Sequence, residues 1–339
     1  MKFFYKGFNS TSFQRILFFP ICFALSVILI TCNKSTDIND TSSTETNNPP
    51  LSYFSIFPDT LVTTNGAPIF LTITARDTSG ADVSDLAPSY SSSDDNIVGV
   101  QQDGRINANG IGQATLTATA GGKTAKVVIY VGASSYDLEN LGIPKMLNAN
   151  HIDLSKIGRI SRFRSTVGHS YTDSDSTETC RSMKHYFEPK STVDWTSVDI
   201  YSPVTGTITG LQIDGHWGYQ VRISCVSQPI FFVAIFHVNI DSGIVKGKWI
   251  HAGDHLGKHA SSFTMSDIAV TYKGKENGHL VSFFEAITDS VFELYHARGV
   301  PSRQAAIISK EERDADPVPC VGEEQFTVEG TIPDWLVLN

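Results

Sequence analysis

Two patterns of hydrophobic and polar positions divide the chain. Between residues 51 and 131, short segments alternate apolar and polar side chains, as half-buried strands do, and turns containing Gly separate them. A second series of strand-like segments lies between residues 181 and 270, and residues 280–295 then repeat apolar side chains at helical spacing. The sequence therefore predicts two β regions followed by a helical addition. The predicted strands are 69–75, 114–120, 125–131, 197–201, 206–209, 219–226, 230–238 and 267–272.

The first 50 residues follow neither pattern. Lys2, Lys6 and Arg15 precede an uncharged apolar stretch, residues 16–31, which is too short for a comfortable membrane span. The stretch ends at Cys32 and resembles the signal of bacterial lipoproteins, in which this Cys is lipidated, although the residue before it is Thr. We therefore expect a signal peptide over 1–31, a lipid anchor to a membrane at Cys32, and a disordered tether over 32–50, rich in Ser, Thr, Asn and Asp. A plain signal anchor is the alternative.

Export would place the folded part in an oxidising compartment, where disulfides persist. Cys180, Cys225 and Cys320 lie outside the signal, and three single pairings are open. Cys180 and Cys320 both lie in polar, loop-like sequence, whereas Cys225 lies in a strand-like segment. We favour a bridge between Cys180 and Cys320, with Cys225 buried and unpaired.

Length and charge narrow the classes of function. A chain of 339 residues suggests about two domains. The 26 Lys and Arg residues are outnumbered by 35 Asp and Glu residues, for a formal net charge of −9. Because no basic excess is available to neutralise phosphates, we expect no nucleic-acid partner.

The first β region contains a series of short segments in a fixed order: 77–80, 90–94, 97–100, 103–106 and 110–116. This order of features resembles the bacterial Ig-like group 2 (Big2) domain, although Tyr90 stands where the family commonly has Trp. The resemblance covers 51–132 and implies an Ig-like β-sandwich. Such a domain is either a spacer or an adhesive module. Residues 133–180, which follow it, are predicted to be a linker.

Three segments of the second β region, within 181–339, form a pattern: a turn at Ser202-Pro-Val-Thr-Gly206, the segment around His237, and a hairpin at Ala252-Gly-Asp254. This pattern resembles the M23 (lysostaphin/LytM-like) peptidoglycan metallopeptidases. It implies an M23-like β domain and, in active members, a zinc ion with about three protein ligands and an open position for water.

The same resemblance assigns candidate site residues. His185 matches the first zinc ligand, and Glu188 stands one position before the expected acidic ligand, where Pro189 is found. His237 matches a catalytic His. Asp267 occupies the place of a second catalytic His, and Ala269, which faces the same side of its strand, occupies that of a zinc ligand.

Three further histidines recur at intervals of four residues. His251, His255 and His259 would form a ridge on a helix, but Gly253 and Gly257 interrupt that pattern. We interpret them as solvated histidines of a hairpin.

The predicted fold class is mainly β: an Ig-like β-sandwich followed by an M23-like β domain with a C-terminal helical extension. The function we favour is a non-catalytic M23-like module without a cofactor, which binds peptidoglycan or an envelope protein or scaffolds an assembly. One alternative is a zinc-dependent peptidoglycan endopeptidase with a rearranged site. Another is a surface adhesin that acts through the Ig-like domain.

Overall fold

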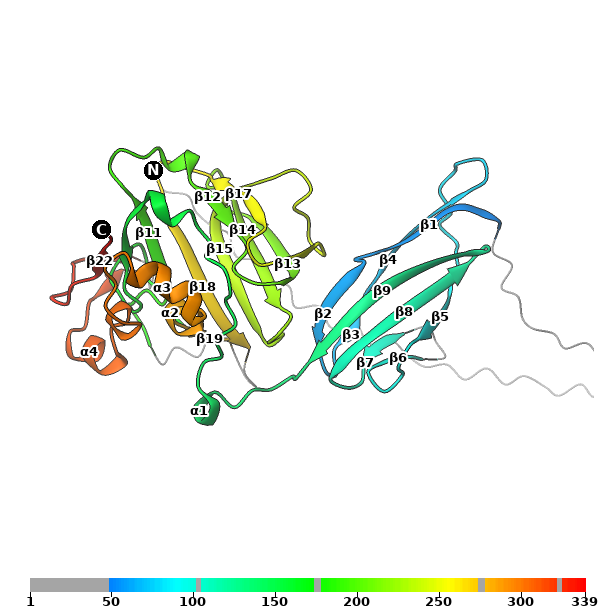
Figure 1. Cartoon of the computed structure of the whole chain (residues 1–339), viewed down its shortest axis with the longest axis horizontal. Coiled ribbons are helices and arrows are strands. Elements are labelled where there is room, and N and C mark those ends of the chain that lie inside the picture. The colour runs from blue at the N-terminus through cyan, green and yellow to red at the C-terminus, as the bar shows by residue number, and fades with distance from the viewer. Residues whose placement is uncertain (1–48, 102–104, 174–177, 274–277, 322–324) are drawn as a thin grey trace, which may run out of the picture. The chain divides into compact units, whose positions relative to one another are not determined.

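The computed structural model describes residues 49–101, 105–173, 178–273, 278–321 and 325–339 (Figure 1). The predicted signal peptide, Cys32 and nearly all of the tether lie outside these ranges. Among the helices of the described ranges, none is both long enough and apolar enough to cross a membrane.

Residues 51–132 form strands that share one hydrophobic core. Alternation along the two longest strands builds this core, because every second side chain of β8 and β9 points inward; Leu116, Val127 and Ile129 are fully buried. The strands pair in three sheets, ordered β1-β4, β2-β9-β8-β5 and β3-β7-β6. Their bounds are β1 Leu51–Phe57, β2 Thr60–Thr64, β3 Pro68–Ile69, β4 Thr72–Asp77, β5 Ser89–Ser92, β6 Val98–Val100, β7 Ile106–Ala108, β8 Gly112–Ala120 and β9 Lys123–Gly132.

The second β region forms one larger sheet of eleven strands, from described residues between 157 and 337. Its main path is β16-β13-β14-β15-β18-β11-β10-β22, and β12, β17 and β19 pair beside it (Figure 1). The mainly-β class predicted from the sequence is confirmed. The bounds are β10 Ile157–Ser161, β11 His185–Pro189, β12 Asp199–Tyr201, β13 Gly206–Ile213, β14 Tyr219–Cys225, β15 Phe231–Ile240, β16 Trp249–Ile250, β17 His255–His259, β18 Ser266–Lys273, β19 Gly278–Val281 and β22 Trp335–Val337.

The two faces of this sheet are built differently. One, which we call the core face, carries the main hydrophobic cluster, including Phe187, Ile235 and Ile268. The opposite face, which we call the site face, carries a small cluster that includes Phe236 and Ala269. Since successive side chains of a strand alternate between faces, one residue of register decides to which face a side chain belongs.

The helical addition differs from the single long helix expected over 280–295. Residues 278–281 form β19, and two short helices follow, α2 (Phe283–Ala286) and α3 (Asp289–His296). Ile287 and Thr288 between them have extended backbone, with ψ angles of 148° and 164°. The apolar period continues across this break because both helices bury side chains in the same core, so the period alone did not reveal it.

Residues 302–315 do not form one continuous helix either. A 3-10 helix (Gln304–Ala306) is followed by extended residues and then by α4 (Lys310–Ala315), whose N-cap is Ser309. Ile308 lies in the extended part, where its N–H donates to the carbonyl of Phe163. That long-range bond replaces the helical one.

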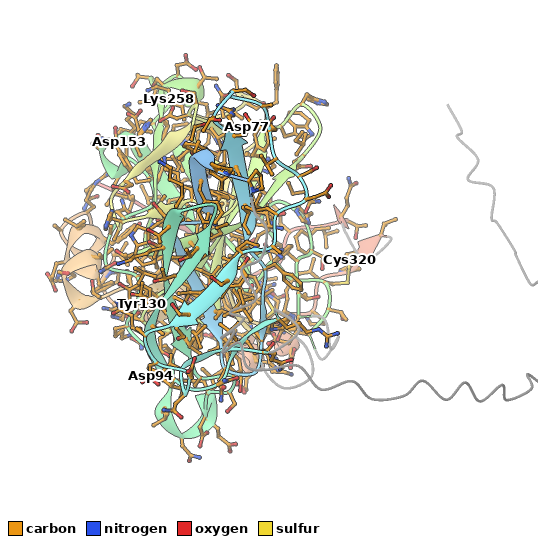
Figure 2. All side chains as sticks on the ribbon, turned by 90° about the vertical axis from the view of Figure 1, so that its right-hand side faces the viewer. Asp77, Asp94, Tyr130, Asp153, Lys258 and Cys320 are labelled. Carbon is orange, nitrogen blue, oxygen red and sulfur yellow. A yellow bond between two sulfur atoms is a disulfide. The ribbon has the colours of Figure 1, made fainter. Side chains whose placement is uncertain are left out.

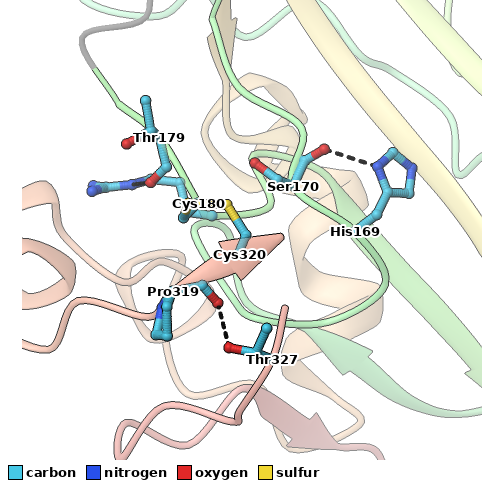
Figure 3. Close-up of a disulfide and its surroundings, with 8 residues drawn as sticks. His169, Ser170, Thr179, Cys180, Pro319, Cys320 and Thr327 are labelled. Carbon is cyan, nitrogen blue, oxygen red and sulfur yellow. Dashed lines mark hydrogen bonds between the residues drawn. A yellow bond between two sulfur atoms is a disulfide. The ribbon is translucent and has the colours of Figure 1, made fainter. Parts of the chain in front are cut away.

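Several small elements lie outside the sheets described above. They are α1 (Leu138–Leu141), the 3-10 helices Leu154–Lys156 and Trp195–Ser197, and the two-stranded sheet of β20 (Cys320–Val321) and β21 (Gln325–Phe326). A disulfide joins Cys320 to Cys180, with Cα atoms 5.4 Å apart (Figure 3). Cys225 is a buried free thiol. The pairing matches the one favoured from the sequence.

Candidate functional site

The candidate site lies on the site face of the large sheet, around Asp267 of β18. The side chain of Asp267 is fully buried. Its register partner on the neighbouring strand β11 is Tyr186, so Tyr186 and the residue two positions before it, Lys184, point to the same face as Asp267. Ala269 follows on this face and carries no donor atom.

Lys184 and Asp267 form a buried ion pair. The Nζ atom of Lys184 lies 2.6 Å from Oδ2 of Asp267, and the two side chains are 2% and 0% exposed. The rings of Phe236 and Tyr171 face the ammonium group, with centroids 4.2 and 4.4 Å from Nζ. Burial alone lowers the pKa of Lys184, but the Asp267 carboxylate outweighs it and holds that pKa above its ordinary value. Lys184 is therefore a fixed cation at neutral pH.

His237 of β15 lies on the other side of Asp267. Its Nε2 is 3.4 Å from Oδ1 of Asp267, and its Nδ1 is 3.6 Å from Oδ2 of Asp214, which follows β13. The backbone of His237 has a φ angle of 60°, in the left-handed region that side chains with a Cβ rarely adopt. The N–H of Ala260 donates to the carbonyl of His237 across this bend. Strained backbone of this kind is concentrated at functional sites.

A cavity of about 250 Å³ opens beside these groups. Lys184 and His237 line it from the sheet, and Asp214 lines it from the β13–β14 hairpin. Tyr171 and His169 line it from the loop that precedes β11. Figure 3 shows this loop near the Cys180–Cys320 disulfide, with Nδ1 of His169 donating to the carbonyl of Ser170 at 2.8 Å.

His259 departs from the interpretation as a solvated hairpin histidine. It ends β17 and is 1% exposed, with its ring centroid 6.3 Å from that of His237 and 4.5 Å from that of Trp195. Its Nε2 donates to the carbonyl of Thr264 at 3.0 Å. Burial lowers the pKa of His259 to about 4, so it is a neutral wall of the site at pH 7.

The other two histidines of that series are exposed, as the hairpin interpretation expects. His255 belongs to a surface ion-pair network around Asp199, whose Oδ1 lies 3.2 Å from Nε2 of His255 and 2.6 Å from Nζ of Lys258. Lys156 connects Asp199 to Asp153, and Figure 2 labels Asp153 and Lys258 near each other.

His185 does not face Asp267, contrary to its expected role as a metal ligand. It lies on the core face with Phe187, one residue out of register with Lys184. Its Nδ1 donates to the carbonyl of Ser161 at 2.9 Å, and its Nε2 accepts from the hydroxyl of Ser282 at 2.9 Å. Both ring nitrogens are thus used in the core. The correction is that Lys184 is the residue of this segment that meets Asp267.

Glu188, the second expected metal ligand, is also directed elsewhere. Its carboxylate pairs with the guanidinium of Arg159, which stacks over the ring of Trp335 at 4.1 Å. Glu188 and Met265 line a separate hollow of about 540 Å³. Of the four expected site residues, the structure brings together His237 and Asp267 only.

These residues do not fit a zinc ion. Zinc in a catalytic site needs about three lone-pair donors at roughly 2.0–2.3 Å. Around Asp267, the position of a ligand is taken by Ala269, and the protonated amine of Lys184 offers no lone pair. The Lys184 cation already lies on Oδ2 of Asp267, where it would repel a metal ion. Within the described ranges, no group of three or more His, Cys, Asp and Glu residues is arranged to hold a metal.

Sequence reasoning missed Lys184 and Asp214. Lys184 and His185 are neighbours, so their side chains point to opposite faces of the sheet and only one of them can lie beside Asp267. The sequence does not show which one, because the register of the strand decides it. Asp214 reaches His237 only because β13 and β14 pair as a hairpin and β14 pairs with β15. The register of these two pairings sets the proximity of Asp214 to the site, so it could not be predicted from the sequence.

Comparisons with known proteins give distant likenesses of fold. No family model matches the chain, and no curated protein matches it. Among solved structures, Helicobacter pylori Csd3 aligns at 12% identity over 64% of this chain and 49% of its own, with a TM-score of 0.32. A zinc-containing peptidase from Vibrio cholerae aligns at 11% identity over 63% of this chain and 78% of its own, with a TM-score of 0.31.

A third structure is described as a glycyl-glycine endopeptidase lytM from Ruminococcus gnavus. It aligns at 14% identity over 30% of this chain and 44% of its own, with a TM-score of 0.26. The chain thus spans less than half the length of the Ruminococcus and Helicobacter proteins. TM-scores of this size do not assign a role to any single residue of this chain.

Proposed function

We propose that this chain is an exported bacterial lipoprotein whose C-terminal β domain binds a cell-envelope ligand without cleaving it. The ligand would be peptidoglycan or an envelope protein, and the first β region would be a Big2-type domain that acts as a spacer above the membrane. Cys32 would carry the lipid anchor.

One observation carries the non-catalytic part of the proposal. The ammonium of Lys184 lies 2.6 Å from Asp267, in the place where the M23-like sequence pattern puts a metal site. An internal cation neutralises the buried carboxylate of this region, which therefore offers a metal ion no free negative charge. Because the pKa of Lys184 is held above its ordinary value, the cation persists at neutral pH and blocks metal entry.

The cavity beside this pair supports a binding role. Its walls combine the aromatic rings of Tyr171 and Phe236 with polar groups of Asp214 and His237, the mixture typical of small-ligand sites. Without a metal-activated water, a bound ligand would be held and not hydrolysed.

The experiment compares binding with cleavage in the full-length chain. Zinc would be measured in protein purified without chelator, and sedimentation with insoluble peptidoglycan would be measured alongside release of soluble fragments. We expect sub-stoichiometric zinc, no release of fragments, and sedimentation with the wall material. Stoichiometric zinc together with cleavage that is lost in His237→Ala would overturn the proposal in favour of a peptidase.

A further inference from the structure

The charged and hydrogen-bonding groups that line the cavity on the site face favour one chemical class of ligand. We propose that it binds a primary alkylammonium group, paired with the carboxylate of Asp214. This inference rests on the proposed function, since it names the chemical class of ligand for the same binding domain.

The supply of hydrogen-bonding groups is the first reason. Nζ of Lys184 is the strongest donor at the cavity, and it is already held by Oδ2 of Asp267 at 2.6 Å and by Nε2 of His169 at 3.3 Å. Buried acceptor capacity remains at the wall: among the described residues, Nδ1 of the lining residue His237 has no hydrogen-bond partner. A ligand rich in donors would complement this wall, and leaving such atoms unpaired has a cost.

Charge is the second reason. Lys184 and Asp267 neutralise each other, and the carboxylate of Asp214 remains at the opening, half exposed. Among the residues that line the cavity, the carboxylate of Asp214 is therefore the charge that no ion pair with Lys184 neutralises. An anionic ligand would face this carboxylate, and the Lys184 cation on the same wall is already in contact with Asp267.

The geometry between Asp214 and His237 fits one nitrogen. Oδ2 of Asp214 and Nδ1 of His237 are 3.6 Å apart, so a single ammonium could lie about 2.8–2.9 Å from both. The alkyl chain of the ligand would then lie along Tyr171 and Phe236, which also line the cavity. A volume of about 250 Å³ corresponds to roughly eight waters, enough for a short amine.

A metal ion is a poorer occupant. Asp214 and His237 supply two metal ligands, one fewer than a zinc site requires. Lys184 also adds a fixed positive charge nearby. An ammonium needs no such coordination sphere, because two hydrogen bonds and one charge pair suffice to orient it.

The test uses three probes with the same four-carbon chain: n-butylammonium, 1-butanol and butyrate. Each is titrated into the full-length chain by calorimetry at pH 7.5. We expect butylammonium to bind with a Kd of about 1 mM, in line with a ligand of five heavy atoms, and the other two at least tenfold more weakly. Asp214→Asn should weaken butylammonium binding at least tenfold.

Asp214→Asn is expected to fold, because the turn uses the backbone of residue 214, whose N–H donates to the carbonyl of Gly218. Its matched control is Asp241→Asn, another exposed carboxylate beside a histidine, where Oδ2 lies 2.6 Å from Nδ1 of His255. The control should bind butylammonium like the parent chain.

Equal affinity for 1-butanol, or unchanged binding in a folded Asp214→Asn chain, would overturn the inference. Such a result would leave the proposed function standing if the chain also contained no zinc, cleaved nothing and still sedimented with peptidoglycan. Zinc-dependent cleavage would end both.

Discussion

Lys184 and Asp267 neutralise each other inside the protein, 2.6 Å apart and out of contact with solvent. Both side chains are almost fully buried, so each charge depends on the other. Removal of one partner should therefore cost much more than removal of both.

The first prediction concerns that dependence. Lys184→Met leaves the Asp267 carboxylate buried without a cation, and we expect it to lower the free energy of unfolding by about 3–5 kcal/mol. The double variant Lys184→Met/Asp267→Asn should recover more than half of that loss. Urea unfolding at pH 7 gives both values, and the double-mutant cycle gives the coupling energy.

A surface lysine provides the control. Lys310, 45% exposed in its pair with Asp314, should lose less than about 0.5 kcal/mol on mutation to Met. If Lys184→Met lost as little stability as Lys310→Met, the ion pair with Asp267 would not stabilise the fold. Lys184 would then not be the cation on which the Asp267 carboxylate depends.

The sheet was largely predictable, and the reason is physical. Segments such as 219–226 and 230–238 alternate or are wholly apolar, and strands β14 and β15 occupy nearly the same ranges. The break between α2 and α3 was not predictable, because Ile287 keeps an apolar side chain at the expected position while its backbone becomes extended.

Only part of the site could be predicted. His237 and Asp267 were identified through the resemblance to M23 peptidases, which is carried by segments around these positions. Assigning His185 instead of Lys184 failed by one residue, because both faces of β11 are buried and hydrophobicity does not mark which one faces Asp267. That choice depends on register with β18, a long-range property.

The second prediction concerns acid stability. His151 and His185 are buried among aromatic rings, with His151 4.5 Å from Phe187 between centroids. Burial lowers the pKa of His151 to about 3 and that of His185 to about 4, from an ordinary value of 6.5. Below pH 6.5 the unfolded chain takes up protons that the folded chain cannot. Stability present above pH 6.5 is therefore lost as the pH falls toward 4, by about 2 kcal/mol per histidine at pH 5.

His151→Leu separates this effect from others. Neither ring nitrogen of His151 has a hydrogen-bond partner among the described residues, so the substitution breaks no such bond. We expect little change in the unfolding free energy at pH 7 and a loss between pH 7 and 5 that is about 2 kcal/mol smaller than in the parent chain. His296→Gln, at an exposed position, should leave the pH dependence unaltered. An identical acid slope in His151→Leu would contradict the assignment.

The third prediction concerns the disulfide. Cys180 and Cys320 close a loop across a separation of 140 residues, and Cys180 lies four residues before Lys184. Replacing both by Ser should lower the unfolding free energy by about 2–5 kcal/mol, because the unfolded chain gains freedom. Digestion without reductant should yield one peptide pair linked through these residues.

Cys225→Ala is the matched control for that experiment. This thiol is buried but unpaired, so its removal should leave the linked peptide pair intact and cost less stability. Linked peptides containing Cys225 would show that the pairing differs in the exported protein.

The fourth prediction tests the anchor. Cys32 follows a basic start and an uncharged apolar stretch, the arrangement that resembles a lipoprotein signal. Cells grown with labelled palmitate should incorporate label into the parent chain, which should sediment with membranes, because each acyl methylene buried in lipid contributes about 0.8 kcal/mol. Cys32→Ala should abolish labelling. Cys22→Ala, within the same apolar stretch, should remain labelled and membrane-bound. Equal labelling of Cys32→Ala and the parent chain would place the lipid elsewhere and remove the anchor from the proposed function.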